Sequence, residues 1–277
     1  MSERLFGALL GFIAIGVVYT CLERAFPARA AERWPGPAWR TDACFFFGQY
    51  LLWSIASLWV LAHVHRSIDA HAVTSLRDTM ARMPLVVQAT LSVVLGDVLV
   101  YWFHRACHRF DVLWRFHAVH HSSERVDWLA AHREHPVDGI LTQLCQNLPG
   151  MLLGLPFEVL GALIAFRGAW AILIHSNVRL PLGPARWLFG APELHHFHHA
   201  RLRDTRHNFA NLAPWLDLVF GTYLRPAPDE SFAMGLVEPF PKGYLAQLVQ
   251  PFRFDGTVSP GAEREPNEAV HWRDTAE

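Results

Sequence analysis

The chain has 277 residues, of which 52% are hydrophobic and only 18% are charged. Soluble domains usually carry about 25% charged residues, so this deficit predicts contact with lipid. The net charge of −1 offers no basic surface, and we expect no nucleic-acid partner. The 17 histidines are unusual, because imidazole is the commonest metal ligand in proteins.

Apolar runs of membrane length follow one another along the chain. Residues 5–20 lack the basic start and cleavage site of a signal peptide, so we expect a retained transmembrane helix. Residues 44–62 and 84–103 form the next two runs. Residues 140–174 exceed one span of about 20 residues and contain prolines and glycines, which predicts a helical hairpin. We therefore predict an all-α integral membrane bundle with about four membrane-embedded helical segments.

Two polar, histidine-rich stretches flank the predicted hairpin at residues 104–138 and 190–223. Both must lie on one side of the membrane if the hairpin enters and returns. Arginines are frequent in both stretches, and positive residues favour the cytoplasmic side. We expect a multi-pass membrane protein whose histidine-rich helical cap lies in the cytosol.

Short histidine clusters carry the chemical signal. His104 and His108 are four residues apart and share one helical face. Two HxxHH triplets follow, and on a helix each triplet can offer three nitrogens to a common centre. A single pair would more often be a solvated polar face, whereas all of these together predict a metal site. The eight expected ligands are His104, His108, His117, His120, His121, His195, His198 and His199.

The ligand types narrow the choice of metal. Eight imidazoles are twice the number that a tetrahedral zinc site uses, so two ions account for them better. The cysteines form no pattern for an iron–sulfur cluster, and the HExxH motif of zinc proteases is absent. Imidazole suits iron, and iron can activate dioxygen. We expect two iron ions, with O2 as a co-substrate.

Asp97 lies two helical turns before His104, within an apolar run. A carboxylate inside a membrane span is costly and usually functional. One expectation is that Asp97 accepts a hydrogen bond from a ligand imidazole and fixes its tautomer. The alternative is a hydrogen bond that only packs two helices together.

These motifs resemble the fatty acid hydroxylase/sterol desaturase superfamily over roughly residues 85–225. The resemblance is carried by His104-x3-His108, His117-Ala-Val-His120-His121, Arg133-Glu-His135-Pro136, His195-x2-His198-His199, and Asn208-Phe209 before Asp217-x2-Phe220-Gly221-Thr222-Tyr223. It implies a helical membrane fold with a cytosolic cap over two irons, and O2-dependent hydroxylation or desaturation of a lipid. The chain departs from the pattern at Ala210, where glycine is usual, and at Leu216, where tryptophan is usual.

The resemblance adds further site residues. His175 matches a family histidine at the end of the hairpin and becomes a ninth expected ligand, the alternative being a buried histidine bonded to backbone. His135 either orients a ligand or binds metal itself. His196 is an extra histidine that we interpret as supporting a ligand or lying at the surface.

The sequence thus predicts a membrane di-iron monooxygenase or desaturase that oxidises a lipid C–H bond. The expected organisation is N-terminal transmembrane helices and a loop over residues 1–83, a catalytic domain over 84–225, and a polar tail with an interfacial amphipathic segment over 226–277. No haem-binding or flavin-binding segment is evident, so we expect electrons from a separate redox protein. The alternative from another class is a non-enzymatic membrane protein that binds or transports metal.

Overall fold

A computed structural model describes residues 2–253 except residues 33, 72 and 226–231. The described residues contain helices and two isolated bridges but no strand, which confirms the predicted all-α class. Residues 254–277 of the predicted tail lie outside the described residues. The proposed division of the chain at residues 83 and 225 stays a prediction.

Four helical segments are long and apolar enough to cross a membrane, in agreement with the predicted number. They comprise α1 (Ser2–Ala25), the continuous helix formed by α2 (Trp39–Gly48), η1 (Gln49–Trp53) and α3 (Ser54–Ala70), then α5 (Leu85–Cys107) and α8 (Phe157–His175). Large apolar side chains such as Phe6 and Val86 are exposed on these helices. Lipid is the solvent in which such surfaces are stable.

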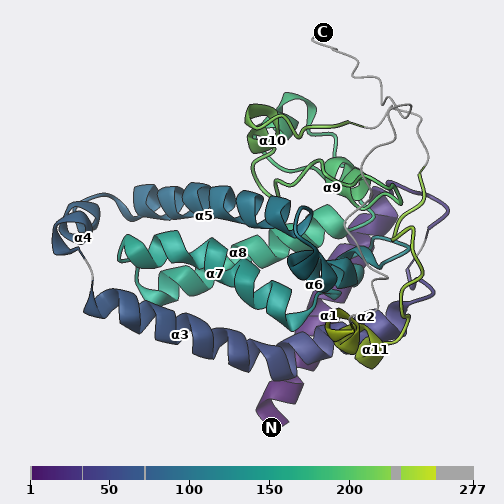
Figure 1. The fold of residues 1–277 in the computed structure, drawn as a ribbon, viewed down its shortest axis with the longest axis horizontal. Coiled ribbons are helices and arrows are strands. Elements are labelled where there is room, and N and C mark those ends of the chain that lie inside the picture. Colours follow the sequence, from purple (N-terminus) through teal and green to yellow (C-terminus); the bar gives the residue numbers. More distant parts are fainter. Residues whose placement is uncertain (1, 33, 72, 226–231, 254–277) are drawn as a thin grey trace.

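The predicted hairpin is present as α7 (Pro136–Leu152) and α8, which are joined by residues 153–156. Pro149 lies within α7 instead of ending it, and the chain reverses at Gly154, whose φ of +80° suits glycine. Figure 1 shows α7 running alongside α3, α5 and α8 at the centre of the bundle, and α7 makes contacts with all three. The short α4 (Thr74–Ala81) connects α3 with α5 at one end of the bundle.

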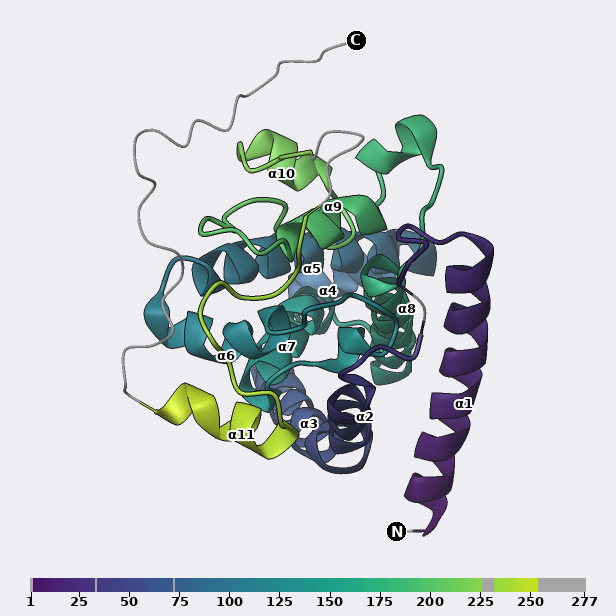
Figure 2. The same ribbon diagram turned by 90° about the vertical axis from the view of Figure 1, so that its right-hand side faces the viewer.

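The opposite end of the bundle carries the short helices and the long loops. These are α6 (Asp111–His121), η2 (Ala130–His132), η3 (Gly183–Trp187), α9 (Pro192–His198), α10 (Trp215–Val219), α11 (Tyr244–Val249) and η4 (Gln250–Phe252). Figure 2 looks onto this end, with α6 and α7 near the centre and α1 standing apart at one side. All of the histidine clusters belong to this end or to the helix termini that reach it.

Buried polar contacts fix this end to the spanning helices. The Glu23 carboxylate, at the end of α1, accepts hydrogen bonds from the backbone N–H groups of Trp128 and Asn177 at 2.9 and 3.1 Å. Asp42 on α2 pairs with the guanidinium of Arg133 at 2.6 Å. Trp128 packs with Phe46 and with Phe12 of α1 in the adjacent hydrophobic core. The loop before α7 is therefore held from two sides.

Gly96 on α5 lets this helix pack closely against α7. A Cβ atom at this position would lie 2.5 Å from the carbonyl oxygen of Gln146 and 2.8 Å from Nη2 of Arg167. We expect Gly96→Ala to destabilise the protein by about 1–3 kcal/mol, because two packed helices would have to separate. Thermal unfolding in detergent measures this.

The matched control is Gly161→Ala on α8, where an added Cβ meets nothing within 4 Å. This change is expected to be neutral or slightly stabilising, because alanine favours helix more than glycine does. Equal melting temperatures for the two variants would contradict the tight α5–α7 contact.

Candidate metal centre

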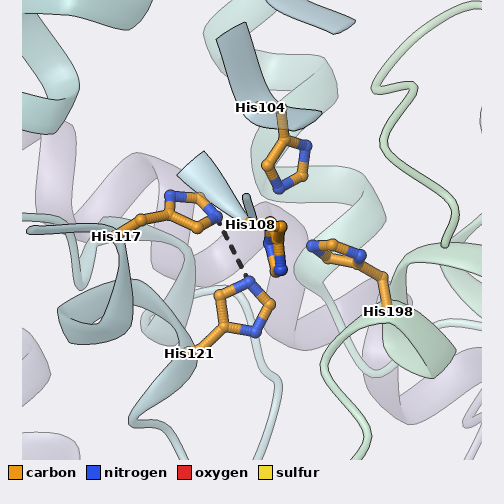
Figure 3. Close-up of side chains that lie close together, drawn as sticks. All are labelled: His104, His108, His117, His121 and His198. Atoms are coloured by element: carbon orange, nitrogen blue, oxygen red, sulfur yellow. Dashed lines mark hydrogen bonds between the residues drawn. The ribbon is translucent and has the colours of Figure 1, made fainter. Parts of the chain in front are cut away.

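The nine histidines expected as ligands converge in two groups of buried or half-buried imidazoles. Within each group, one ring nitrogen of every member lies within 4.8 Å of those of all the others. The first group is His104, His108, His117, His121 and His198; the second is His120, His175, His195 and His199. Figure 3 shows the five rings of the first group turned toward a common point.

The HxxHH triplets are split between the two groups, which corrects the expectation that each serves one centre. In α6, His117 and His121 join the first group while His120 joins the second. In the α9 triplet, His195 and His199 join the second group while His198 joins the first. Helix geometry explains this division of each triplet. Around the helix axis, the side chains at i and i+4 point in directions that differ by about 40°, whereas the side chain at i+3 points about 100° away from that at i+4. Two triplets facing each other thus supply both centres.

The rings of the first group present their Nε2 atoms to the centre. Nε2 of His104, His108 and His198 is buried and has no hydrogen-bond partner in the described part of the protein. Nε2 of His117 lies 3.2 Å from Nε2 of His121, the pair joined by the dashed line in Figure 3. Buried nitrogens without partners are costly, so their convergence fits a metal ion that would accept their lone pairs.

The opposite nitrogen, Nδ1, is anchored in six of the nine rings. His104 donates to the carbonyl of Phe209 at 2.8 Å, and His117 donates to the Asp138 carboxylate at 2.8 Å. Nδ1 of His108 contacts Thr205 Oγ1, and Nδ1 of His198 contacts the carbonyl of His207. Nδ1 of His120 contacts the carbonyl of Arg133, and Nδ1 of His175 contacts the carbonyl of Ala171. An Nδ1–H that donates outward leaves Nε2 unprotonated, which is the form that binds a metal.

The second group is as compact as the first. Nε2 of His175 lies 3.1 Å from Nε2 of His120 and 2.8 Å from Nε2 of His195. Nε2 of His195 in turn lies 3.1 Å from Nε2 of His199. Two imidazoles at right angles on an ion about 2.1 Å away would have nitrogens about 3 Å apart. These distances fit ligands around one ion, and the chemistry of the donor set fits iron.

The Asn208-Phe209 motif after α9 supplies the backbone carbonyl that accepts the Nδ1–H of His104. Asn208 adopts a left-handed backbone with a φ of 54°, a conformation that asparagine tolerates. The Asp217 carboxylate accepts hydrogen bonds from the N–H groups of Phe209 and Ala210 at 2.8 and 2.9 Å. Because Ala210 bonds to Asp217 through its backbone N–H, alanine in place of glycine leaves this hydrogen bond intact.

Asp97 does not contact an imidazole, contrary to our first expectation. Its carboxylate pairs with the Arg167 guanidinium on α8 at 3.3 Å, which matches the helix-packing alternative. The carboxylate that anchors a ring is Asp138, on the first turn of α7. Sequence spacing placed Asp97 inside the bundle on α5. It did not reveal that the partner is Arg167, seventy residues later in the chain.

His135 and His196 both lie outside the two groups. Nδ1 of His135 accepts the N–H of Val137 and caps α7, while its Nε2–H donates to the carbonyl of Leu248. His135 therefore positions the turn that carries Asp138. His196 is buried rather than superficial, and its Nε2–H donates to the carbonyl of Ser176, next to His175.

A cavity of about 160 Å³ lies beside both groups and reaches into the bundle. Five histidines of the groups line it: His104, His117, His120, His175 and His195. Its remaining wall includes Gln49, His132, Glu134, Gln143 and Gln146, which the sequence motifs did not indicate as site residues. The signal that could have found them is the spacing of Gly139, Thr142, Gln143 and Gln146, which places small and polar residues on one face of α7.

Comparison with known proteins gives the same family as the motifs. Residues 89–222 match the fatty acid hydroxylase family. This match supports the superfamily that the motifs indicate. The chain is 36% identical to an ornithine lipid hydroxylase, OlsE, of Rhizobium tropici over 62% of its own length and 53% of that protein. It is 33% identical to human alkylglycerol monooxygenase over 53% of its own length and 33% of that protein. It is 29% identical to a Delta(7)-sterol-C5(6)-desaturase of Nicotiana tabacum over 54% of its own length and 54% of that protein. The match thus spans about half or less of each relative, and no solved structure matches the chain.

Burial controls the protonation of the family histidines outside the spanning helices. It lowers the pKa of His120 to about 4, assisted by the neighbouring His117, and it lowers the pKa of His121 and His199 well below the usual value. These rings are therefore neutral at pH 7 even without a metal. The folded protein keeps them in the form that a metal requires.

The lowered pKa values predict how the stability of the metal-free protein depends on pH. Below the free imidazole pKa of about 6.5, the unfolded chain takes up protons that the folded protein excludes. The thermal midpoint of metal-free protein should therefore fall as the pH drops from 6.5 toward 4. His121→Asn should reduce this dependence, and a midpoint that stays constant over the range in both proteins would contradict neutral burial.

Asp138 offers a direct test of ring anchoring. Asp138→Asn removes the charge that accepts the Nδ1–H of His117. We expect metal affinity to fall about 10- to 100-fold, which is the usual loss when such a partner is changed. Metal titration of the purified protein measures it, with the exposed Asp111→Asn on α6 as the control. Equal affinities for the two variants would reject the anchoring role of Asp138.

Proposed function

We propose that the protein is a di-iron oxygenase that hydroxylates or desaturates a C–H bond of a lipid in the membrane. The observation that carries the proposal is the division of nine imidazoles into two adjoining groups beside one cavity. His121 of the first group stacks on His199 of the second with ring centroids 4.4 Å apart, so the two centres are neighbours. The names of the relatives, which include a hydroxylase, a monooxygenase and a desaturase, support this reaction class.

The protein's own residues would hold and orient the reactants. Iron bound to the two groups would supply the activation of dioxygen and the removal of hydrogen from carbon. The anchored Nδ1–H groups keep the rings fixed, so the ligand geometry need not reorganise during the reaction. The cavity between α5, α7 and α8 would direct one carbon of the lipid toward the imidazoles and exclude bulk water.

The reaction balances only with an outside supply of electrons. Hydroxylation converts the C–H bond, O2, two electrons and two protons into C–OH and water. Desaturation removes two hydrogen atoms from adjacent carbons and reduces O2 to two waters with the same two electrons and two protons. We propose a separate redox protein as the donor, which reaches the site from the cytoplasmic side. The arginine-rich stretches around the histidine clusters support that orientation.

His120 distinguishes an enzyme from a passive metal-binding protein. His120→Ala removes one ligand of the second group and should reduce lipid oxidation to background, because one centre would be incomplete. The protein should remain in the membrane fraction, since the spanning helices are unchanged. Mass spectrometry of lipids from cells expressing each variant, searching for a gain of one oxygen or a loss of two hydrogens, measures the effect.

The matched control is His71→Ala, an exposed histidine after α3 whose loss should leave the lipid products unchanged. Oxidised lipid at the wild-type level from His120→Ala would reject the required role of this ring. Wild-type protein that binds metal but gives no oxidised lipid and consumes no O2 under reducing conditions would favour metal storage or transport.

A further inference from the structure

The cavity beside the metal groups has an unusually polar wall for a site inside a membrane bundle. Apart from the histidines of the two groups, its polar lining residues include Gln49, His132, Glu134, Gln143, Gln146 and Asn211. They come from separate parts of the fold, including the α2–α3 helix, the loop before α7, and α7 itself. Polar side chains at membrane depth are costly and are kept where they serve a function.

The local structure turns these side chains inward. The π-helical turn η1 interrupts the long α2–α3 helix at Gln49, and such turns occur frequently at functional sites. On α7, Gln143 and Gln146 lie on the face that also carries Gly139 and Thr142, and this face lines the cavity. The inner face of α7 is thus polar, whereas a helix buried at the centre of a bundle is usually apolar on all sides.

Two of these groups lack a partner for a specific atom. His132 is buried, and its Nδ1–H donates to Oε1 of Gln49 at 3.1 Å, which leaves Nε2 as an acceptor. Nε2 of His132 and Oδ1 of Asn211 are both buried without a hydrogen-bond partner in the described part of the chain. An unsubstituted acyl chain would leave these atoms unpaired, at a cost for each of them.

The charged groups along the same wall already have partners. Arg167 pairs with Asp97, and the Asp138 carboxylate accepts the Nδ1–H of His117. Burial and the neighbouring Asp138 raise the pKa of Glu134 to about 8, which favours the neutral form of its carboxyl group. No unpaired cation among the lining residues is available for a phosphate or carboxylate, which would require one.

We infer that the carbon oxidised at this site lies beside a neutral hydrogen-bonding group of the lipid, such as an amide or a hydroxyl, rather than in the middle of an acyl chain. Gln143, Gln146 and His132 would bind that group and so place the neighbouring C–H bond at the imidazoles. The polar end of the lipid would enter the cavity and its hydrocarbon would remain toward the membrane. This inference rests on the proposed function for the chemistry, but the polar recognition can be tested without turnover.

The binding experiment uses metal-loaded protein in nanodiscs without O2. The probes are N-palmitoylethanolamine, which has an amide and a hydroxyl, and octadecane, a hydrocarbon of similar length. We expect the amide probe to bind at least about tenfold more tightly, because two or more hydrogen bonds distinguish it. Gln146→Leu should weaken binding of the amide probe roughly five- to tenfold and leave octadecane binding unchanged.

Gln88→Leu is the matched control, because Gln88 is also a buried glutamine on a membrane helix but does not line the cavity. Selective loss with Gln146→Leu and unchanged binding with Gln88→Leu would support the inference. Equal binding of the two probes by wild-type protein, or equal effects of the two variants, would overturn it.

The turnover experiment adds ¹⁸O2 and a chemical reductant to the same nanodiscs. Tandem mass spectrometry then locates the label within N-palmitoylethanolamine. Label in the fragment that contains the amide and its neighbouring carbons supports the inference, whereas label confined to the far half of the acyl chain overturns it. Absence of both ¹⁸O label and a loss of two hydrogens from both probes in iron-loaded protein would instead count against the proposed function, and the binding result would still decide polar recognition.

Discussion

The structure of the metal centre depends on hydrogen bonds that face away from it. Each imidazole has two nitrogens, and in six of the nine rings the outer one is engaged by a fixed acceptor. Four of these acceptors are backbone carbonyls, whose positions are set by the fold and not by a side-chain rotamer. The inner nitrogens are consequently both unprotonated and correctly directed before a metal arrives.

This arrangement explains why residues far from the imidazoles belong to the same unit. The Asp42–Arg133 pair fixes the loop whose Arg133 carbonyl anchors His120. Asp217 likewise fixes the backbone whose Phe209 carbonyl anchors His104. Each carboxylate controls the direction of a ring that it never contacts. A substitution at either site would therefore disturb metal binding through the backbone.

The sequence predicted the class, the number of membrane-length segments and which histidines gather, because these depend on local composition and spacing. It did not predict how the triplets divide, since that depends on how α6 and α9 face each other. The partner of Asp97 was also inaccessible, because Arg167 lies on another helix and only tertiary packing brings the two together. Helical periodicity predicts which face of a helix carries a side chain, but it does not predict which other helix packs against that face.

The polar face of α7 shows how the same helix can serve both the fold and the site. Asp138, on its first turn, anchors His117, and Gln143 and Gln146 follow along the cavity. A helix with this face exposed to lipid would leave amide groups without partners, so α7 is stable only at the centre of the bundle, where α3, α5 and α8 surround it. The need to bury α7 thus explains the architecture of the bundle. Because the apolar helices contact the lipid, the cavity at the centre can remain polar.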